Sequence, residues 1–401
     1  MNELAHTLEQ LAIDQGRDAE ASGRFVSSFT PVTVGAKENA QRSKEFEDRF
    51  IMTMKDNAKS ALSTDVYHDG NVLNLGAFIS DADEYESLDS LLNRNAWKAV
   101  NNAKATHDQD LIDTALDDDL VNMMEGNSFH MISYGTGPNG TASDKEGRII
   151  ARIIASGKKA DGLTGIDVNR TFVSESSTLL GDKFSIPTRG IQGEFVWGAP
   201  RGLPEIIVPE GVTKVVAMFG NTAFNAANYN RDGKNISYRE SVENFFSKMN
   251  VQNGLGHYLI LSVDTDQNTK SQERRYAVTK EHEGLILTPF AIARLRGVID
   301  RPYPIYAHWK MAVRYDQKDN TVLMLAESKK DHVMPISNGR DVKFAEGEQR
   351  VIMASHKWPV HEHTSILTRS GYEICKVFEA AHNPHKLILA RATSAPRFEP
   401  F

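Results

Sequence analysis

Three glycines stand at the spacing of a dinucleotide-binding turn. Gly135, Gly137 and Gly140 fit the pattern G-x-G-x-x-G within the segment GTGPNG. The strand-like run FHMISY precedes them, and the helix-like run DKEGRIIARII follows. Glycines in such a turn let a pyrophosphate approach the N-terminus of the next helix closely. The turn is therefore one candidate ligand site.

The surroundings of this turn argue against a nucleotide site. Pro138 and Asn139 occupy its interior, and the following helix has its own capping box from Ser143 to Glu146. The next segment, GKKADGLTG, has the composition of a glycine-rich loop, although a second parallel strand should begin there. The sequence therefore favours the simpler alternative, a Gly/Pro/Asn turn that joins a strand to a helix.

Three histidines near the C-terminus form a second candidate site. His356, His361 and His363 lie in the segment SHKWPVHEHT. On a strand, an H-x-H pair points both rings to one face, where they could bind a metal with Glu362 or Glu373 as a further ligand. The spacing matches neither the zincin motif H-E-x-x-H nor a complete cupin pattern. Solvent-facing or interface histidines are therefore favoured.

The remaining motifs are incomplete. The segment DTDQNTKSQE begins like a calcium loop, but Thr269 stands where glycine is needed and Arg275 where a bidentate carboxylate is needed. Neither G-x-x-x-x-G-K-[ST] nor G-x-S-x-G occurs in the chain. We therefore predict that the chain is not an enzyme and has no catalytic, cofactor-binding or metal-binding residues.

Composition indicates a folded, disulfide-free chain outside the membrane. Of its 401 residues, 40% are hydrophobic and 25% charged, which predicts a packed interior. The single cysteine, Cys375, excludes an intramolecular disulfide and favours synthesis in a reducing compartment. Neither a signal peptide nor an apolar run of about 18 residues is found. The net charge of −7, without a basic run, argues against sequence-specific DNA binding.

Hydrophobic periodicity divides the chain into three parts. We predict an N-terminal helix and extended arm in residues 1–35, a helix-rich region in 36–170, and a β-rich region with an extended tail in 171–401. A capping box from Ser237 to Glu240 predicts an internal helix in the last part. The segment GYEICKVFEAAH is a second candidate helix. The predicted strands include TFVSES, GLILTP, TKVVAMFG, HYLILSVDT, TVLMLAES, QRVIMAS and KLILARAT.

One long extended segment of the chain is typical of a subunit that assembles with copies of itself. Residues 185–212 form a long Gly/Pro-rich stretch with apolar side chains between turns. Exposed apolar arms of this kind are usually covered by a neighbouring subunit. The alternative is an ordinary β-hairpin that packs on its own domain, and the sequence does not separate the two.

In size, acidity and helix-then-sheet order, and in the segments MNELAHTLEQLAIDQGRD and LILARATSAPRFEPF, the chain resembles the major capsid proteins of tailed phages. It looks most like the coat proteins of podoviruses related to coliphage N4. The resemblance implies an α+β fold of the HK97 type, with a helical N-terminal third and a sheet-rich C-terminal part. Its long spine helix would be 84–104 or 144–156, and its extended loop 64–79 or 185–212.

The function that this resemblance implies is mechanical. Subunits would form hexamers and pentamers of an icosahedral shell around phage DNA, made in the host cytoplasm and located in the virion. Portal, scaffold or decoration proteins would be partners, DNA would be contacted non-specifically, and neither a cofactor nor a membrane would be needed. One alternative is a soluble intracellular enzyme that uses the Gly135–Gly140 turn or a metal at His356, His361 and His363. Another is a phage tail or baseplate component.

Overall fold

A computed structural model of the chain describes residues 28–29, 36–57, 62, 108–137, 139–167, 170–192, 206–220, 222–225, 237–276, 280–299, 303–337, 339 and 341–396. Most of the predicted N-terminal arm, the candidate loop 64–79 and the candidate spine helix 84–104 therefore lie outside the described residues.

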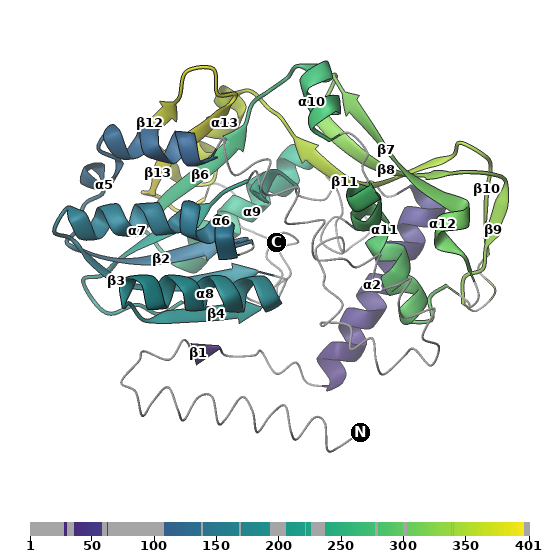
Figure 1. Ribbon diagram of the computed structural model, residues 1–401, viewed down its shortest axis with the longest axis horizontal. Coiled ribbons are helices and arrows are strands. Elements are labelled where there is room, and N and C mark those ends of the chain that lie inside the picture. Colours follow the sequence, from purple (N-terminus) through teal and green to yellow (C-terminus); the bar gives the residue numbers. More distant parts are fainter. Residues whose placement is uncertain are drawn as a thin grey trace.

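The larger of two lobes is built on an eight-stranded sheet (Figure 1). The strand order is β1-β4-β3-β2-β5-β6-β13-β12. All pairs from β1 to β6 are parallel, and β13 runs antiparallel to both of its neighbours. The strands are β1 (Ser28–Phe29), β2 (Ser128–Tyr134), β3 (Lys159–Asp167), β4 (Thr188–Gln192), β5 (Thr213–Met218), β6 (Tyr258–Asp264), β12 (Tyr372–Glu379) and β13 (His385–Ala392).

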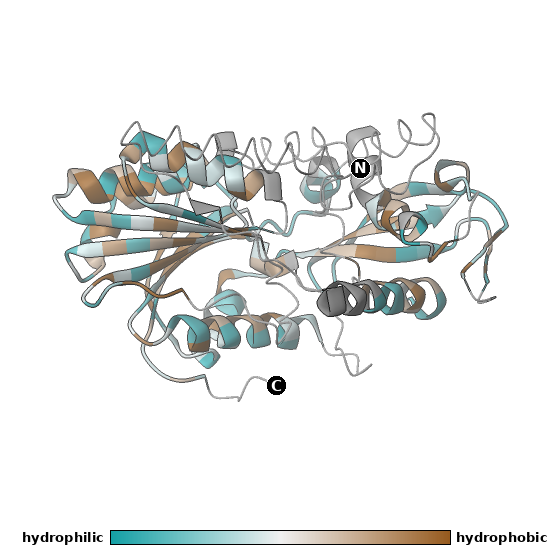
Figure 2. Ribbon diagram, turned by 90° about the horizontal axis from the view of Figure 1, so that it is seen from below, coloured by the Kyte–Doolittle hydropathy of each residue, from teal (hydrophilic) through white to brown (hydrophobic). Residues whose placement is uncertain are grey.

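Helices cover both faces of this sheet (Figure 2). One face packs on α5 (Leu120–Met123), α7 (Glu146–Ala155) and α8 (Arg170–Phe184), and the short α6 (Asn139–Asp144) lies beside them. The other face packs on η3 (Thr222–Asn225), α9 (Tyr238–Asn253) and α13 (Val360–Arg369). Strand β6, YLILSVD, is buried at every position, as expected for a strand covered on both faces. The lobe is a three-layer α/β arrangement.

The smaller lobe lies between β6 and β12 in the sequence and takes one helix from the N-terminal part. Phe50 of α2 contacts Phe290 of α11 at 5.6 Å between ring centroids, and Phe290 contacts Trp309 at 5.0 Å. These rings belong to one apolar core. The elements are α2 (Ala36–Asp56), α10 (Thr269–Arg275), α11 (Lys280–Leu295), α12 (Ile305–His308), β7 (Trp309–Asp316), β8 (Thr321–Ser328), β9 (His332–Met334), β10 (Val342–Phe344) and β11 (Gln349–His356), with sheets β11-β8-β7 and β10-β9.

This architecture contradicts the predicted HK97-type α+β fold. Helices α6 and α7 connect β2 to β3, and α8 connects β3 to β4, so helices and strands alternate along this part of the chain. The candidate spine helix 144–156 corresponds to α7, which has only 10 residues and covers the sheet. The candidate loop 185–212 contributes β4, a strand of the sheet, and residues 193–205 lie outside the described part.

The local predictions had mixed outcomes. Strands β5, β6, β8, β11 and β13 and helix α9 are confirmed, and the Ser237 hydroxyl accepts a hydrogen bond from the Glu240 amide at 3.2 Å. TFVSES and GLILTP were wrongly predicted as strands, because both lie in helices, α8 and α11. The candidate helix at 371–382 is wrong, because β12 occupies most of it.

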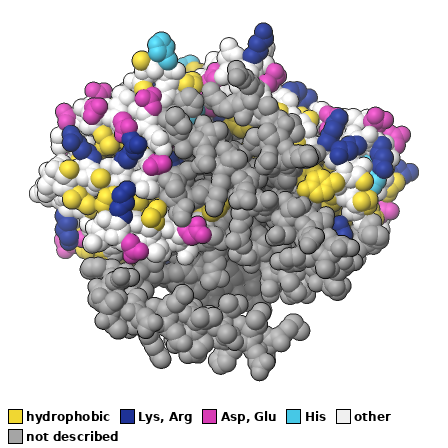
Figure 3. All heavy atoms as spheres, in the orientation of Figure 1, with side chains coloured by type: hydrophobic (Ala, Val, Ile, Leu, Met, Phe, Trp, Pro, Cys, Tyr) yellow, Lys and Arg dark blue, Asp and Glu magenta, His cyan; other side chains and the backbone are white. Residues whose placement is uncertain are grey.

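The surface and helices of the described residues show two further features. On the face drawn in Figure 3, positive and negative side chains are interspersed over both lobes, so no basic stripe crosses the described part of that face. None of the described helices is long and apolar enough to cross a membrane.

Candidate functional site

The carboxyl ends of β2, β3, β5 and β6 meet at one edge of the large sheet. From β2 the chain continues to β3 and β4 on one side, and it then crosses to β5 on the other side of β2. The strand order therefore reverses between β2 and β5. In open α/β sheets, ligands bind outside the carboxyl ends of the strands at such a switch point.

The glycine turn identified in the sequence follows β2 at this edge. Gly135 has φ +73° and Gly137 has φ +65°, a left-handed conformation that favours glycine. The Gly135 amide donates a hydrogen bond to the Ile166 carbonyl of β3 at 2.8 Å, and the Ser176 hydroxyl of α8 donates to the Gly137 carbonyl at 2.9 Å. The turn is thus fixed against β3 and α8, while Gly140 lies within α6.

Asp167, the last residue of β3, lies beside this turn. Its side chain is largely buried, and its Oδ2 accepts a hydrogen bond from the Gly137 amide at 3.2 Å. In dinucleotide-binding sheets, an acidic residue at this place accepts hydrogen bonds from ribose hydroxyls. The glycine turn and Asp167 together make a candidate site for a nucleoside-containing ligand.

The sequence analysis missed Asp167 because it took the segment before it for a loop. That segment forms β3, and its glycines serve close packing. A Cβ atom on Gly165 would lie 2.9 Å from the Ser177 Oγ and 3.0 Å from the Thr136 Cγ2, and one on Gly162 would lie 2.9 Å from the Pro187 carbonyl oxygen. The signal available in the sequence was an acidic residue that ends the segment after a G-x-G turn.

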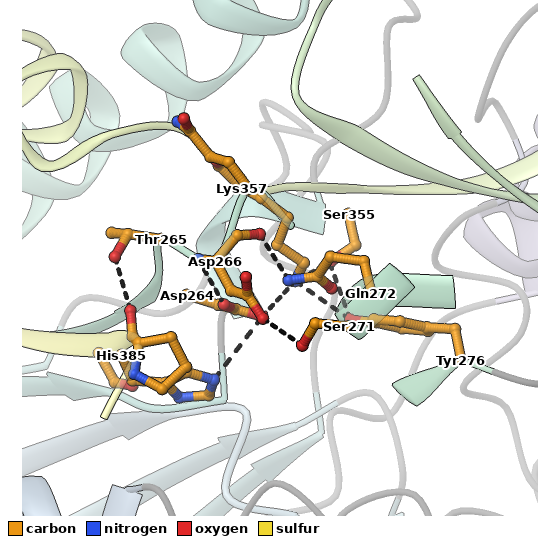
Figure 4. A network of polar contacts seen from close by, with 12 residues as sticks. Asp264, Thr265, Asp266, Ser271, Gln272, Tyr276, Ser355, Lys357 and His385 are labelled. Atoms are coloured by element: carbon orange, nitrogen blue, oxygen red, sulfur yellow. Dashed lines mark hydrogen bonds and ion pairs between the residues drawn. The ribbon is translucent and has the colours of Figure 1, made fainter. Parts of the chain in front are cut away.

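A buried polar network lies near the same edge, where the two lobes meet (Figure 4). Lys357 follows β11 of the smaller lobe and is fully buried. Its Nζ lies 3.0 Å from Asp264 Oδ2 at the end of β6, and it donates to the Tyr276 hydroxyl at 3.1 Å and the Ser355 hydroxyl at 3.0 Å. Burial alone would lower the pKa of Lys357, but the Asp264 carboxylate and Tyr276 raise it above its usual value. Lys357 is therefore a buried cation that joins the lobes.

The residues of the incomplete calcium loop have local partners. Asp266 Oδ2 accepts a hydrogen bond from the Ser271 hydroxyl at 2.5 Å, and its Oδ1 accepts from the Asn268 amide at 3.0 Å. Asn268 Oδ1 in turn accepts from the Ser271 amide at 3.0 Å. These contacts shape the turn that leads into α10.

The three histidines of the second candidate site do not converge. His361 and His363 lie on helix α13 and not on a strand. His356 ends β11 and stacks on Trp358, with ring centroids 4.5 Å apart, and Trp358 in turn lies 6.0 Å from His363. Burial lowers the pKa of His363 to about 3, and its ring packs on Phe224. In the described ranges, no group of three or more His, Cys, Asp or Glu side chains could hold a metal ion, so the metal-site alternative is not supported.

Comparison with known proteins gives a match over most of the chain. A family model described as "Histidine-specific methyltransferase, SAM-dependent" matches residues 114–392. The comparison with curated protein sequences found no match.

Several solved methyltransferase structures show a weak overall likeness. The CcbJ methyltransferase of Streptomyces caelestis has 10% identity and a TM-score of 0.34, covering 72% of this chain and 96% of that one. The amino pentose methyltransferase CalS10 of Micromonospora echinaspora has 10% identity and a TM-score of 0.31, with coverages of 71% and 92%. The magnesium protoporphyrin IX methyltransferase of Synechocystis PCC 6803 has 10% identity and a TM-score of 0.35, with coverages of 75% and 94%.

The family match overturns the function predicted from the sequence. The chain is an enzyme, so the predicted capsid subunit, its place in the virion and the expectation of no enzymatic activity are wrong. The prediction of hexamers and pentamers rested on the resemblance to capsid proteins, so it no longer has support. No contact among the described residues tests it. The alternative of an enzyme is better supported, without the histidine metal site.

Proposed function

Because the chain belongs to the family of S-adenosylmethionine-dependent, histidine-specific methyltransferases, we propose that it transfers a methyl group to a nitrogen of histidine. It is an S-adenosylmethionine-dependent methyltransferase by family. The proposal adds the acceptor, histidine, and places the cofactor at the carboxyl edge between the Gly135–Gly137 turn and Asp167.

The residues at this edge fit the adenosine part of such a cofactor. The Asp167 carboxylate can accept hydrogen bonds from the ribose hydroxyls, and the glycines leave room for a ligand to approach the backbone. The Thr136 hydroxyl, between these glycines, is buried and has no hydrogen-bond partner among the described residues. The observation that carries the placement is the 3.2 Å hydrogen bond from the Gly137 amide to Asp167, because it joins the turn and the carboxylate into one site.

The chemistry requires a nucleophilic nitrogen at the same edge. When bound, S-adenosylmethionine supplies a methyl group on a sulfonium, which a nitrogen with a free lone pair can accept. The chain must therefore hold the acceptor in its neutral form and orient it beside the carboxyl ends of β2 and β5. The smaller lobe adjoins this edge through Lys357 and Tyr276, which supports a role for this lobe in holding the acceptor.

Transfer of a labelled methyl group tests the proposal. The full chain is incubated with S-adenosylmethionine carrying a deuterated methyl group and, in separate reactions, with histidine, other amino acids and a histidine-containing peptide. Mass spectrometry is expected to find the label on free histidine, and fragmentation assigns it to the amino or the ring nitrogen. Label on another acceptor would reject histidine as the substrate. A failure of S-adenosylhomocysteine to bind to the chain would reject the proposed cofactor site.

A further inference from the structure

Four buried charged side chains form a row of alternating sign near the carboxyl edge. His385 Nδ1 lies 3.6 Å from Asp108 Oδ1, and His385 Nε2 lies 3.6 Å from Asp264 Oδ2. Asp264 continues the row to Lys357 at 3.0 Å. All four side chains are at most 2% exposed. Buried charges of this kind persist only when they are paired.

The charge states of the row agree with this geometry. Burial alone would lower the pKa of His385, but Asp108 and Asp264 raise it above its usual value. Burial alone would raise the pKa of Asp108, but His385 and Lys145 lower it below its usual value. His385 therefore favours its protonated form between two carboxylates.

One end of the row holds the turn that follows β5. Asp108 Oδ2 accepts a hydrogen bond from the Gly220 amide at 3.0 Å, and its Oδ1 accepts one from the Ser262 hydroxyl at 2.5 Å. In the pairing of β2 with β5, Tyr134 lies opposite Met218. Gly135 and Phe219 therefore leave neighbouring strands at the same level, so the Phe219–Gly220 turn lies beside the glycine turn.

The other end of the row reaches the smaller lobe. Lys357 follows β11 and donates to Ser355 of that strand and to Tyr276. Tyr276 belongs to the apolar core of the smaller lobe. The four charged residues thus connect the turn after β5 to a rigid part of the other lobe.

The position of these charges within the core argues for more than stability. On β6, Tyr258 and Ile260 belong to an apolar core that also includes Leu387 and Leu389 of β13. Among the buried side chains on this face of the two strands, the polar ones lie at the carboxyl end of β6: Ser262 and Asp264 on β6, and His385 on β13. Apolar side chains there would stabilise the fold as well or better, since desolvation offsets much of the attraction in a buried ion pair. Buried charges that gather at the ligand-binding edge of these two strands indicate a positioning role.

We propose that the row Asp108–His385–Asp264–Lys357 positions the Phe219–Gly220 turn as one wall of the cofactor site and fixes it to the smaller lobe. His385 is the central positioning residue and acts through Asp108, without touching the cofactor. The inference rests on the proposed placement of S-adenosylmethionine at Gly135–Gly137 and Asp167.

Replacing His385 tests the row against a matched control. His385→Asn is neutral and too short to reach both carboxylates, whereas His382→Asn makes the same change at an exposed position three residues away. We expect H385N to raise the dissociation constant of S-adenosylhomocysteine and the KM for S-adenosylmethionine about tenfold or more, because Asp108, which holds the Gly220 amide, loses its ion pair with His385. The kcat at saturating cofactor should stay within a few-fold of the wild-type value, and H382N should match wild type in all three.

A second variant separates positioning from general destabilisation. Asp108→Asn keeps the shape of the side chain but removes its charge, and it should weaken cofactor binding as H385N does, with little further loss in the double variant. Wild-type affinity in both folded variants would overturn the inference and leave the cofactor site intact. Failure of both variants to fold would overturn it too, because the row would then serve the whole fold. A wild-type chain that does not bind S-adenosylhomocysteine would instead reject the proposed function.

Discussion

The Gly137 amide, in the turn after β2, donates a 3.2 Å hydrogen bond to the carboxylate of Asp167, the last residue of β3. This bond links the carboxyl ends of the two strands. A carboxylate has lone pairs for more than one donor, so Asp167 can accept several hydrogen bonds at once. The bond also fixes a left-handed glycine whose backbone would otherwise be free to move. The two residues define where the cofactor is proposed to bind.

Gly165 is predicted to be necessary for the shape of this edge. In Gly165→Ala the new methyl group would lie 2.9 Å from Ser177 Oγ and 3.0 Å from Thr136 Cγ2. We expect a loss of about 1–3 kcal/mol in the free energy of unfolding, typical of overpacking, and weaker binding of S-adenosylhomocysteine. Urea denaturation and calorimetry measure the two effects.

The double variant Gly165→Ala/Ser177→Ala provides the control. Ser177→Ala removes one of the two clashing atoms, so it should recover part of the lost stability, and Ser177→Ala alone should be close to wild type. Equal stability of G165A and wild type would show that the packing around β3 is looser than described.

The sequence predicted the strands whose apolar runs are short and β-branched, and it failed where local composition opposed the tertiary fold. β5 and β13 are of the first kind. β3 contains Gly162 and Gly165, which resemble loop residues until the strands and the helix packed on them are known. The β-prone starts of TFVSES and GLILTP lie in helices, because tertiary packing overrides short-range propensity.

The candidate site was half visible in the sequence. The glycine turn has a recognisable spacing, whereas Asp167 gains meaning only once β3 is placed beside β2. The row from Asp108 to Lys357 has no sequence signal, because its members come from four separate segments that meet only in the folded chain. The histidine spacing was misleading because His361 and His363 lie on a helix and not on a strand.

Lys357 is predicted to contribute strongly to stability. Lys357→Met removes the nearer of the two cations beside Asp264, at 3.0 Å, and leaves only His385 at 3.6 Å. Breaking a buried pair in this way costs about 3–5 kcal/mol. The change is measured as the free energy of unfolding in urea. Lys386→Met, which removes an ion pair between Lys386 and the exposed Glu379 at 3.3 Å, should cost less than about 1 kcal/mol. Equal losses in the two variants would contradict the role of the buried pair.

Acid should destabilise the fold through its buried neutral histidines. Burial lowers the pKa of His363 to about 3 and that of His257 to about 4, from an ordinary value of 6.5. Below pH 6.5 the unfolded chain binds protons that the folded chain does not, so stability is full above that pH and falls as the pH decreases. At pH 5 each histidine should cost about 2 kcal/mol relative to neutral pH.

A single substitution isolates the contribution of His363. The wild-type chain should lose stability relative to His363→Leu by about 2 kcal/mol between pH 7.5 and pH 5, as read from urea midpoints. His361→Leu changes an exposed histidine on the same helix and serves as the control. Its free energy of unfolding should change between pH 7.5 and pH 5 as that of wild type does. An unchanged difference between wild type and H363L at the two pH values would show that His363 is not held neutral.

Isothermal titration of S-adenosylhomocysteine into wild type, Asp167→Asn and Asp161→Asn tests the proposed cofactor site most directly. Asp161 lies on the same strand toward its other end, where it pairs with Lys159 at 2.9 Å. We predict binding to wild type and D161N with equal affinity, and a loss of roughly tenfold or more in D167N, because a charged acceptor for the ribose is removed. Equal affinity in all three proteins, or no binding to wild type, would contradict the placement of the cofactor at Gly137 and Asp167.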